Sequence, residues 1–269
     1  MYQTIYFYII QQLLLFTARV EPLSGQEIVA ANNLDISFMA SIQNTTGYHI
    51  CSGVLVTFQY VLTILNCLQG KPVNYFRIAF GMTDLQHLLP CGINAWYSYY
   101  TWAAGQNLSD IRDENDIALI KLSIEPMNGV PIRLTQWNKQ QLQGKTAMIL
   151  GWTRLQNSDQ LTKGIVNILK DEDCSKMMNR ITNRNHTISS KIICTFAEPY
   201  VLLEKRDVGG PLLDQDGNLL GINLYSGPRS YLSWGDFTND FIQKYQVNHH
   251  SALTYLNFQR FIRHISMHY

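Results

Sequence analysis

The sequence is poor in charged residues. Of its 269 residues, 15% are Asp, Glu, Lys or Arg, against about 25% in an average soluble protein. Its 21 basic and 20 acidic side chains leave a net charge of +1, so the chain lacks the basic field that nucleic acid requires and a polybasic surface for anionic lipid. Apolar residues make up 46% of the chain. That share excludes disorder as the main state, because such a chain can bury enough surface to fold.

Motifs that hold metals, phosphates or cofactors are also missing. The chain has seven His and five Cys, but no Cys-x-x-Cys and no His-Glu-x-x-His, the spacings typical of zinc sites. It has no glycine-rich phosphate loop and no Gly-x-Ser-x-Gly turn. The doublet His249–His250 lies in a polar segment and is interpreted as solvated. We therefore expect neither a metal ion nor a cofactor.

Long hydrophobic runs are absent after the first residues of the chain. Residues 1–18 are almost wholly apolar or aromatic and carry no charged side chain. A run this short, interrupted by Gln11 and Gln12, is typical of a signal peptide rather than of a membrane span of about 20 residues. An N-terminal anchor and a buried strand are the alternatives. We expect a leader over residues 1–24 and a secreted, extracellular mature chain that does not contact a membrane.

Three Asn-x-Ser/Thr triplets agree with that compartment. They begin at Asn44, Asn107 and Asn185. Each triplet alone is weak evidence, because such triplets are common by chance. Beside a leader and an oxidising compartment that permits disulfides, we expect these asparagines to be glycosylated in part.

Short β-rich segments separated by turn residues follow the leader. Many short strands with regular turns favour a sandwich or a barrel. Near the end of the chain, Leu253, Leu256, Phe261, Ile262 and Ile265 recur near helical spacing and predict an amphipathic helix. The strands are expected at Phe38–Ile42, Val54–Val56, Tyr60–Ile64, Phe76–Phe80, Ile117–Leu122, Ala147–Leu150, Ile165–Leu169 and Leu219–Leu224.

Four segments carry a resemblance to a known family. They are Ile28–Ala31, the stretch from Cys51 to Cys67, Asn115–Leu122 with its Asp-Ile-Ala-Leu, and Arg206–Leu212, which reads Arg-Asp-Val-Gly-Gly-Pro-Leu. In this order they resemble the mature N-terminus, the Ala-Ala-His-Cys stretch, the Asp-Ile-Ala-Leu block and the Gly-Asp-Ser-Gly-Gly-Pro-Leu loop of trypsin-like serine proteases. The resemblance spans nearly the whole mature chain. It implies one all-β domain over residues 25–269, built of two six-stranded antiparallel β-barrels with a C-terminal α-helix.

The catalytic positions implied by this resemblance are Asn66, Asp116 and Val208. Acyl transfer needs a hydroxyl nucleophile, an imidazole that takes and returns its proton, and a carboxylate that orients the imidazole. Val208 has no lone pair to attack with, and the amide of Asn66 does not titrate near neutral pH. Only the carboxylate, Asp116, is retained. Because the three groups act as a unit, we predict that this triad does not hydrolyse peptides.

Residues near the predicted catalytic positions also differ from those that the resemblance implies. Arg206 stands where the resemblance implies the glycine of the oxyanion hole, and Leu202 stands at the base of the specificity pocket. Leu224 replaces a residue whose hydroxyl would bond Asp116. The resemblance therefore implies that catalysis, specificity and substrate docking have changed together.

Activation in this family frees an Ile N-terminus, which then pairs with the Asp before the nucleophile. Ile28 and Asp207 are both present, but Glu27 precedes Ile28 where an activating protease would need Arg or Lys. We therefore expect no cleavage at that bond. A buried unpaired carboxylate is costly, and the resemblance implies His49 as its partner. We predict a His49–Asp207 pair.

The chain has five cysteines, so at least one of them cannot form a disulfide within the chain. The resemblance implies the disulfides Cys51–Cys67 and Cys174–Cys194, while Glu204 stands in place of a cysteine of a third bridge. Cys91 remains. It is either a buried free thiol or the site of a disulfide to a partner.

Three functions follow from these patterns. The leading one is a secreted, non-catalytic homologue that binds an extracellular protein, such as a protease or another cascade component. It would act as a cofactor, decoy or regulator in an immune cascade or in reproductive fluid. The alternatives are an active serine-type endopeptidase with a rebuilt site and a structural glycoprotein.

Overall fold

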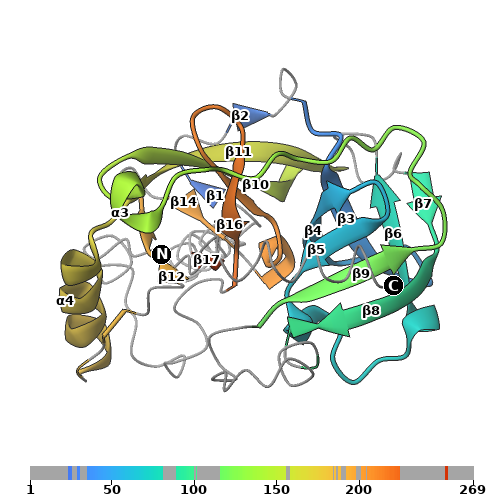
Figure 1. Ribbon diagram of the computed structural model, residues 1–269, viewed down its shortest axis with the longest axis horizontal. Helices are drawn as coiled ribbons and strands as arrows, with labels where there is room; N and C mark the ends of the chain where they lie inside the picture. Colours follow the sequence, from blue (N-terminus) through green and yellow to red (C-terminus); the bar gives the residue numbers. More distant parts are fainter. Residues whose placement is uncertain are drawn as a thin grey trace, which may run out of the picture.

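Antiparallel strands account for most of the regular structure in the computed structural model of the protein, and they form two curled sheets (Figure 1). The structure describes residues 24–25, 29–30, 35–80, 89–99, 101, 116–155, 158–183, 185, 187–188, 192–197, 201–203, 205–224 and 252–253. Everything below refers to these residues.

The first sheet has seven antiparallel strands in the order β7-β6-β3-β4-β5-β9-β8. Its central strands are rich in Val, Ile and Leu, and β5 is buried along its whole length. Such strands form because branched apolar side chains pack well on a pleated, buried surface. The strands are β3 (Met39–Asn44), β4 (His49–Thr57), β5 (Tyr60–Thr63), β6 (Phe76–Phe80), β7 (Leu89–Cys91), β8 (Ile93–Ser98) and β9 (Ala118–Leu122).

The second sheet is built around a long hairpin of β10 (Thr146–Leu155) and β11 (Ser158–Ile168). Its strand order is β13-β11-β10-β15-β16, and β2 also pairs with β11. Two further strand pairs, β1 with β14 and β12 with β17, lie outside it. The remaining strands are β1 (Ser24–Gly25), β2 (Val29–Ala30), β12 (Ile192–Ile193), β13 (Thr195–Phe196), β14 (Val201–Leu202), β15 (Pro211–Leu213), β16 (Leu219–Ile222) and β17 (Ala252–Leu253).

Helices are few. The short α3 (Lys139–Leu142) precedes β10, and α4 (Asp171–Thr182) follows β11. Three 3-10 turns complete the described elements: Leu65–Cys67, Val73–Tyr75 and Lys205–Asp207. No helix within the described ranges is long and apolar enough to cross a bilayer.

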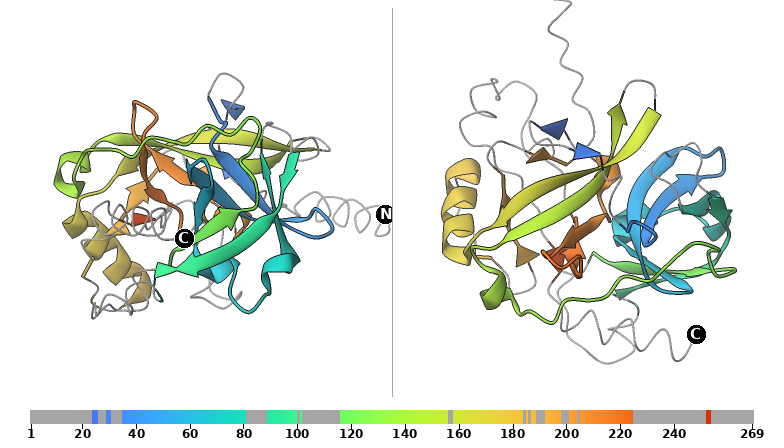
Figure 2. Two further views of the ribbon diagram at one scale, coloured as in Figure 1. Left: turned by 45° about the vertical axis from the view of Figure 1, so that its right-hand side comes forward. Right: turned by 90° about the horizontal axis from the view of Figure 1, so that it is seen from above.

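Buried apolar side chains form two clusters. The larger one combines side chains of the first sheet with Leu150, Trp152, Leu161 and Ile222 of the second. The smaller one lies wholly within residues 142–220. Because the larger cluster crosses from one sheet to the other, the two sheets pack against each other rather than standing apart, as both views in Figure 2 show.

The predicted all-β architecture is confirmed, with three differences at its edges. The first sheet has seven strands rather than six, since β7 and β8 are separate strands. Leu253, assigned to the C-terminal helix, lies instead in β17 and pairs with Ile192. The rest of that predicted helix and residues 1–23 of the predicted leader fall outside the described residues. Ser24, the last residue of that leader, pairs with Leu202.

Candidate functional site

The loop from Arg206 to Gly210 docks on the edge of β4. The Ser52 amide donates to the Val208 carbonyl at 2.9 Å, and the Ser52 hydroxyl donates to the Arg206 carbonyl at 3.2 Å. Gly209 has a φ of +84°, and a Cβ there would meet the Ser52 carbonyl oxygen and the Thr63 hydroxyl. The sequence places glycine at this position because only glycine accommodates both the φ and the close approach.

Val208 turns its side chain into the protein rather than toward solvent. It is 6% exposed and belongs to the larger hydrophobic cluster. On the other side of the loop, the Gly209 amide donates to the Asn223 carbonyl at 2.7 Å, and the Asn223 amide donates to the Gly210 carbonyl at 2.8 Å. Both sheets therefore hold the loop that carries Val208.

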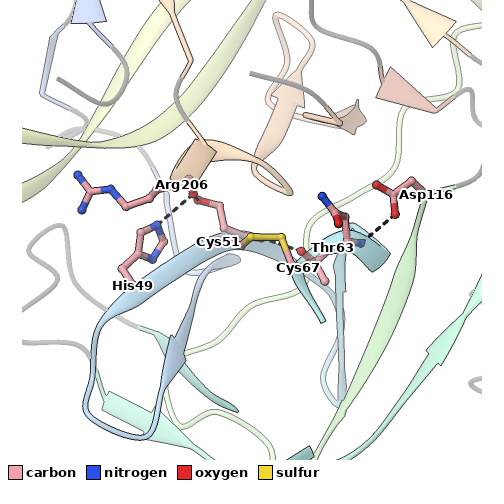
Figure 3. The surroundings of a disulfide bond; sticks show 8 residues. His49, Cys51, Thr63, Cys67, Asp116 and Arg206 are labelled. Carbon is pink, nitrogen blue, oxygen red and sulfur yellow. Dashed lines mark hydrogen bonds between the residues drawn. A yellow bond between two sulfur atoms is a disulfide. The ribbon is translucent and has the colours of Figure 1, made fainter. Parts of the chain in front are cut away.

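Asn66 and Asp116 lie side by side. The Asn66 backbone N–H donates to Asp116 Oδ1 at 2.9 Å, whereas the Asn66 side chain is exposed. Burial raises the pKa of the Asp116 carboxyl, and the backbone N–H groups of Asn66 and Leu65 partly oppose that rise. Figure 3 shows Asp116 on one side of the Cys51–Cys67 bridge and the His49–Arg206 contact on the other.

The predicted His49–Asp207 pair is wrong, because both ring nitrogens of His49 have other partners. Nδ1 is 2.7 Å from the Ser41 hydroxyl, and Nε2 donates to the Arg206 carbonyl at 3.1 Å (Figure 3). Burial, aided by the nearby Arg206 charge, lowers the pKa of His49 to about 3. The imidazole is therefore neutral, and a neutral ring donates to a carbonyl rather than forming an ion pair with a carboxylate.

Asp207, which belongs to the same loop, is fully buried. Its Oδ1 accepts a hydrogen bond from the Trp152 backbone N–H at 3.1 Å. The Trp152 ring in turn meets the His49 ring edge-on, with centroids 6.1 Å apart. Ile28, whose amine would be the partner of Asp207 in a cleaved chain, lies outside the described residues.

Both predicted disulfides are present in the structure, Cys51–Cys67 and Cys174–Cys194. Cys91 is free and buried, and its thiol donates to the Ile124 carbonyl at 3.2 Å. A disulfide to a partner would require this thiol to leave its buried position. The burial therefore favours the free thiol of the two alternatives that the sequence left open.

The structure describes most of the remaining predicted positions, but not all of them. Asn44 lies at the turn between β3 and β4, where its Oδ1 accepts from the exposed Thr46 at 2.7 Å. Asn185 is exposed, and Asn107 is outside the described residues. Leu202 lies in β14, and Leu224 packs against the larger cluster.

The two sheets, the docked loop and the Cys51–Cys67 bridge agree with a match to a known family. The family model described as Trypsin matches residues 25–236. The chain belongs to the trypsin family.

Curated relatives support this membership at modest identity. Granzyme M of Rattus norvegicus is 29% identical over 194 residues, covering 70% of this chain and 73% of that protein. A chymotrypsin-like serine proteinase of Haliotis rufescens is 29% identical over 214 residues, covering 72% of this chain and 80% of that protein.

Solved structures agree on the fold. A mutant of human heparin binding protein superposes with a TM-score of 0.64 at 18% identity, covering 90% of this chain and 96% of that one. Neuropsin, a serine protease of mouse brain, gives a TM-score of 0.61 at 19% identity, covering 86% and 94%. At these identities the likeness concerns the fold alone.

Sequence reasoning missed the residues that anchor the loop in this trypsin-family chain. Ser52 and Thr63 meet it from the first sheet, and Asn223 meets it from the second. The Asn223 side chain is fully buried, and neither of its polar atoms has a hydrogen-bond partner. No local pattern marks these residues, since their role exists only once the loop has docked.

Proposed function

We propose that this member of the trypsin family is a secreted, non-catalytic homologue that acts by binding an extracellular protein. The observation that carries the proposal is Val208. Where the family's chemistry requires an exposed hydroxyl, the chain has an isopropyl group that is 6% exposed and packed in the hydrophobic core.

The second missing group is the base. Asn66 presents an exposed carboxamide, which cannot take a proton near neutral pH. Removing either the nucleophile or the base of such a triad removes most of its rate enhancement, because the groups act together. Val208 and Asn66 thus support loss of hydrolysis independently of each other.

Asp116 is retained for a structural reason under this proposal. Its carboxylate accepts the Asn66 backbone N–H, and its own backbone carbonyl accepts from Leu65 at 3.4 Å. The segment around Asp116 is therefore tied to the 3-10 turn that carries Asn66. That linkage stabilises the fold and requires no reaction.

The proposed partner is an extracellular protein, such as a protease or another component of an immune cascade or of reproductive fluid. The apolar N-terminal run, the two disulfides and the exposed Asn185 support secretion and glycosylation. The net charge of +1 does not favour nucleic acid. The buried Cys91 argues for a non-covalent complex.

Labelling with a fluorophosphonate probe tests the loss of catalysis. We expect the wild-type protein to remain unlabelled and to cleave no member of a fluorogenic peptide panel, while an active trypsin at equal concentration is labelled. The N66H/V208S double variant, which places an imidazole and a hydroxyl at these two positions, is the matched comparison. Labelling seen only with this variant depends on residues 66 and 208. Labelling or turnover that stays with the wild-type protein through purification would support the active endopeptidase instead.

A capture experiment tests the binding role. Immobilised protein is exposed to fluid from the secreting tissue, and bound proteins are quantified. A stoichiometric extracellular partner that survives washing supports the proposal. Absence of any stoichiometric partner supports a structural glycoprotein.

A further inference from the structure

A surface depression of about 450 Å³ lies beside α3. Four side chains line it: Gln136, Trp137, Gln141 and Lys145. Its volume falls within the range of roughly 300–1,000 Å³ that small-molecule sites occupy, but all four lining side chains are exposed, so the depression is an open hollow rather than an enclosed pocket. In Figure 1, α3 lies at the end of the molecule away from β3 to β9, so the depression is separate from the first sheet and its Asn66–Asp116 contact.

The backbone around this depression is firmly held. Asn138 and Gln141 form a capping box, in which Asn138 Oδ1 accepts the Gln141 N–H at 3.0 Å and Gln141 Oε1 accepts the Asn138 N–H at 2.9 Å. The Trp137 N–H donates to the Thr135 hydroxyl at 3.3 Å. The Lys145 carbonyl accepts from the Ile168 N–H at 2.8 Å, which ties the opposite wall to β11. These contacts fix the backbone beneath the depression, so binding a ligand has to order the exposed side chains but not the backbone.

The lining combines an aromatic ring, a cation and amide groups. Lys145 Nζ lies 3.8 Å from the centroid of the Trp137 indole, a close cation–π contact. The ring accepts the ammonium on one side, and an ammonium has three N–H donors. Among the described residues, no hydrogen bond is made by the Gln136 amide or by Gln141 Nε2, and both side chains are exposed. No carboxylate is among the described residues that line the depression.

Charge nearby does not neutralise Lys145. The neighbouring Lys139 forms an ion pair at 2.6 Å with Asp171, the first of three acidic residues at the start of α4, and Lys176 pairs with Asp173 at 3.5 Å. Lys145 has no acidic partner among the ion pairs of the described residues. The depression therefore presents one available positive charge beside hydrogen-bonding amides.

We propose that this depression binds a sugar that carries one carboxylate. The carboxylate meets the Lys145 ammonium, the sugar hydroxyls exchange hydrogen bonds with Gln136 and Gln141, and an apolar face of the pyranose ring packs on the Trp137 indole. A single cation matches a single carboxylate rather than a polyanion, and the chain's balanced charge agrees. An extended acidic peptide fits less well, because its backbone would need paired main-chain groups and the lining offers side chains.

The proposal is independent of the proposed loss of catalysis, because it uses none of the residues near Val208. Saturation-transfer difference NMR on the full-length protein compares 3′-sialyllactose with neutral lactose. We expect saturation at the sialic acid protons and an affinity about threefold higher for sialyllactose, since an ion pair with an exposed lysine adds only modestly to binding. Lack of saturation for both sugars, or equal affinities, overturns the proposal.

Variants at two of the four lining residues, Trp137 and Lys145, test where the sugar binds. Lys145→Gln is expected to reduce sialyllactose affinity to that of lactose, and Trp137→Ala to abolish binding, with thermal melting confirming the fold. Trp137→Phe keeps a ring and retains part of the affinity. The matched control is Lys71→Gln, which removes another lysine lying over an aromatic ring, Tyr75, at 5.1 Å. Affinity unchanged by Lys145→Gln, or tighter binding of an acetylated Glu peptide than of sialyllactose, overturns the assignment.

Discussion

At the scale of single residues, the docked loop depends on Gly209, which has no side chain, and on Val208, whose side chain has no reactive group. Gly209 allows the backbone of the loop to touch Ser52 and Thr63, and its φ of +84° is one that other residues rarely adopt. The side chain of Val208, the residue before Gly209, lies in the hydrophobic core. The identity of residue 208 was readable from the sequence, but its burial was not, because burial depends on contacts with distant strands.

Replacing Gly209 by Ala is expected to destabilise the protein by about 3 kcal/mol, from the strained φ together with the collision of the new Cβ with the Ser52 carbonyl. Urea unfolding followed by circular dichroism measures the loss. Gly217→Ala is the control. Gly217 has a similar φ of +79° but nothing within 4 Å, so its substitution is expected to cost only about 1 kcal/mol. Equal losses for both variants would show that the loop is not packed as described.

At the scale of elements, part of the strands was predictable, whereas β8, the strands of two or three residues and the described helices were not. The expected strand segments overlap β3, β4, β5, β6, β9, β10, β11 and β16, most of which carry a short run of branched apolar residues. Helix α4 was missed, since its apolar residues are few. The signal that could have found it is the acidic first turn of Asp171, Glu172 and Asp173, which is favourable at a helix N-terminus.

Helix α4 depends on the Cys174–Cys194 bridge, which joins it to the segment between β12 and β13. With a sequence separation of 20 between the cysteines, the loop-closure estimate gives a stabilisation of about 3 kcal/mol. The C174A/C194A variant is expected to lose about that much in urea unfolding followed at 222 nm. C91A, which removes the buried cysteine that forms no bridge, is the control and should lose less. An unchanged unfolding midpoint in C174A/C194A would contradict the prediction.

At the scale of the whole molecule, His49 joins the two sheets. It lies at the start of β4, and it contacts the Arg206 carbonyl and the Trp152 ring, which both belong to the second half of the chain. The resemblance predicted a contact between His49 and Asp207, whereas His49 contacts the carbonyl of the preceding residue. The sequence did not reveal which group His49 would meet, because the carbonyl of residue 206 and the carboxylate of residue 207 are neighbours along the chain.

The buried imidazole makes stability depend on pH. The pKa of His49 is about 3 in the folded state and about 6.5 in the unfolded chain. Between these values the unfolded state binds more protons, so the free energy of unfolding falls as pH decreases, by up to about 1.4 kcal/mol per pH unit from this group. Urea unfolding from pH 4 to 8 measures the slope.

The variant His49→Gln isolates this contribution, because the carboxyl groups that titrate in the same range are unchanged. We expect its slope between pH 4 and 6 to be shallower than that of the wild-type protein. Identical slopes would mean that His49 is protonated in the folded state.

The sequence by itself determined which reactions the chain has the groups to perform. It shows Val208 and Asn66 where the resemblance to trypsin-like serine proteases implies a hydroxyl and an imidazole, and the same resemblance pointed to the two disulfides. Only the tertiary structure decided that Val208 is buried, that His49 is neutral and bonded to a carbonyl, and that Lys145 lies over Trp137. The reason is physical: a functional group is set by its own residue, whereas its burial, charge state and partners are set by residues far away in the chain.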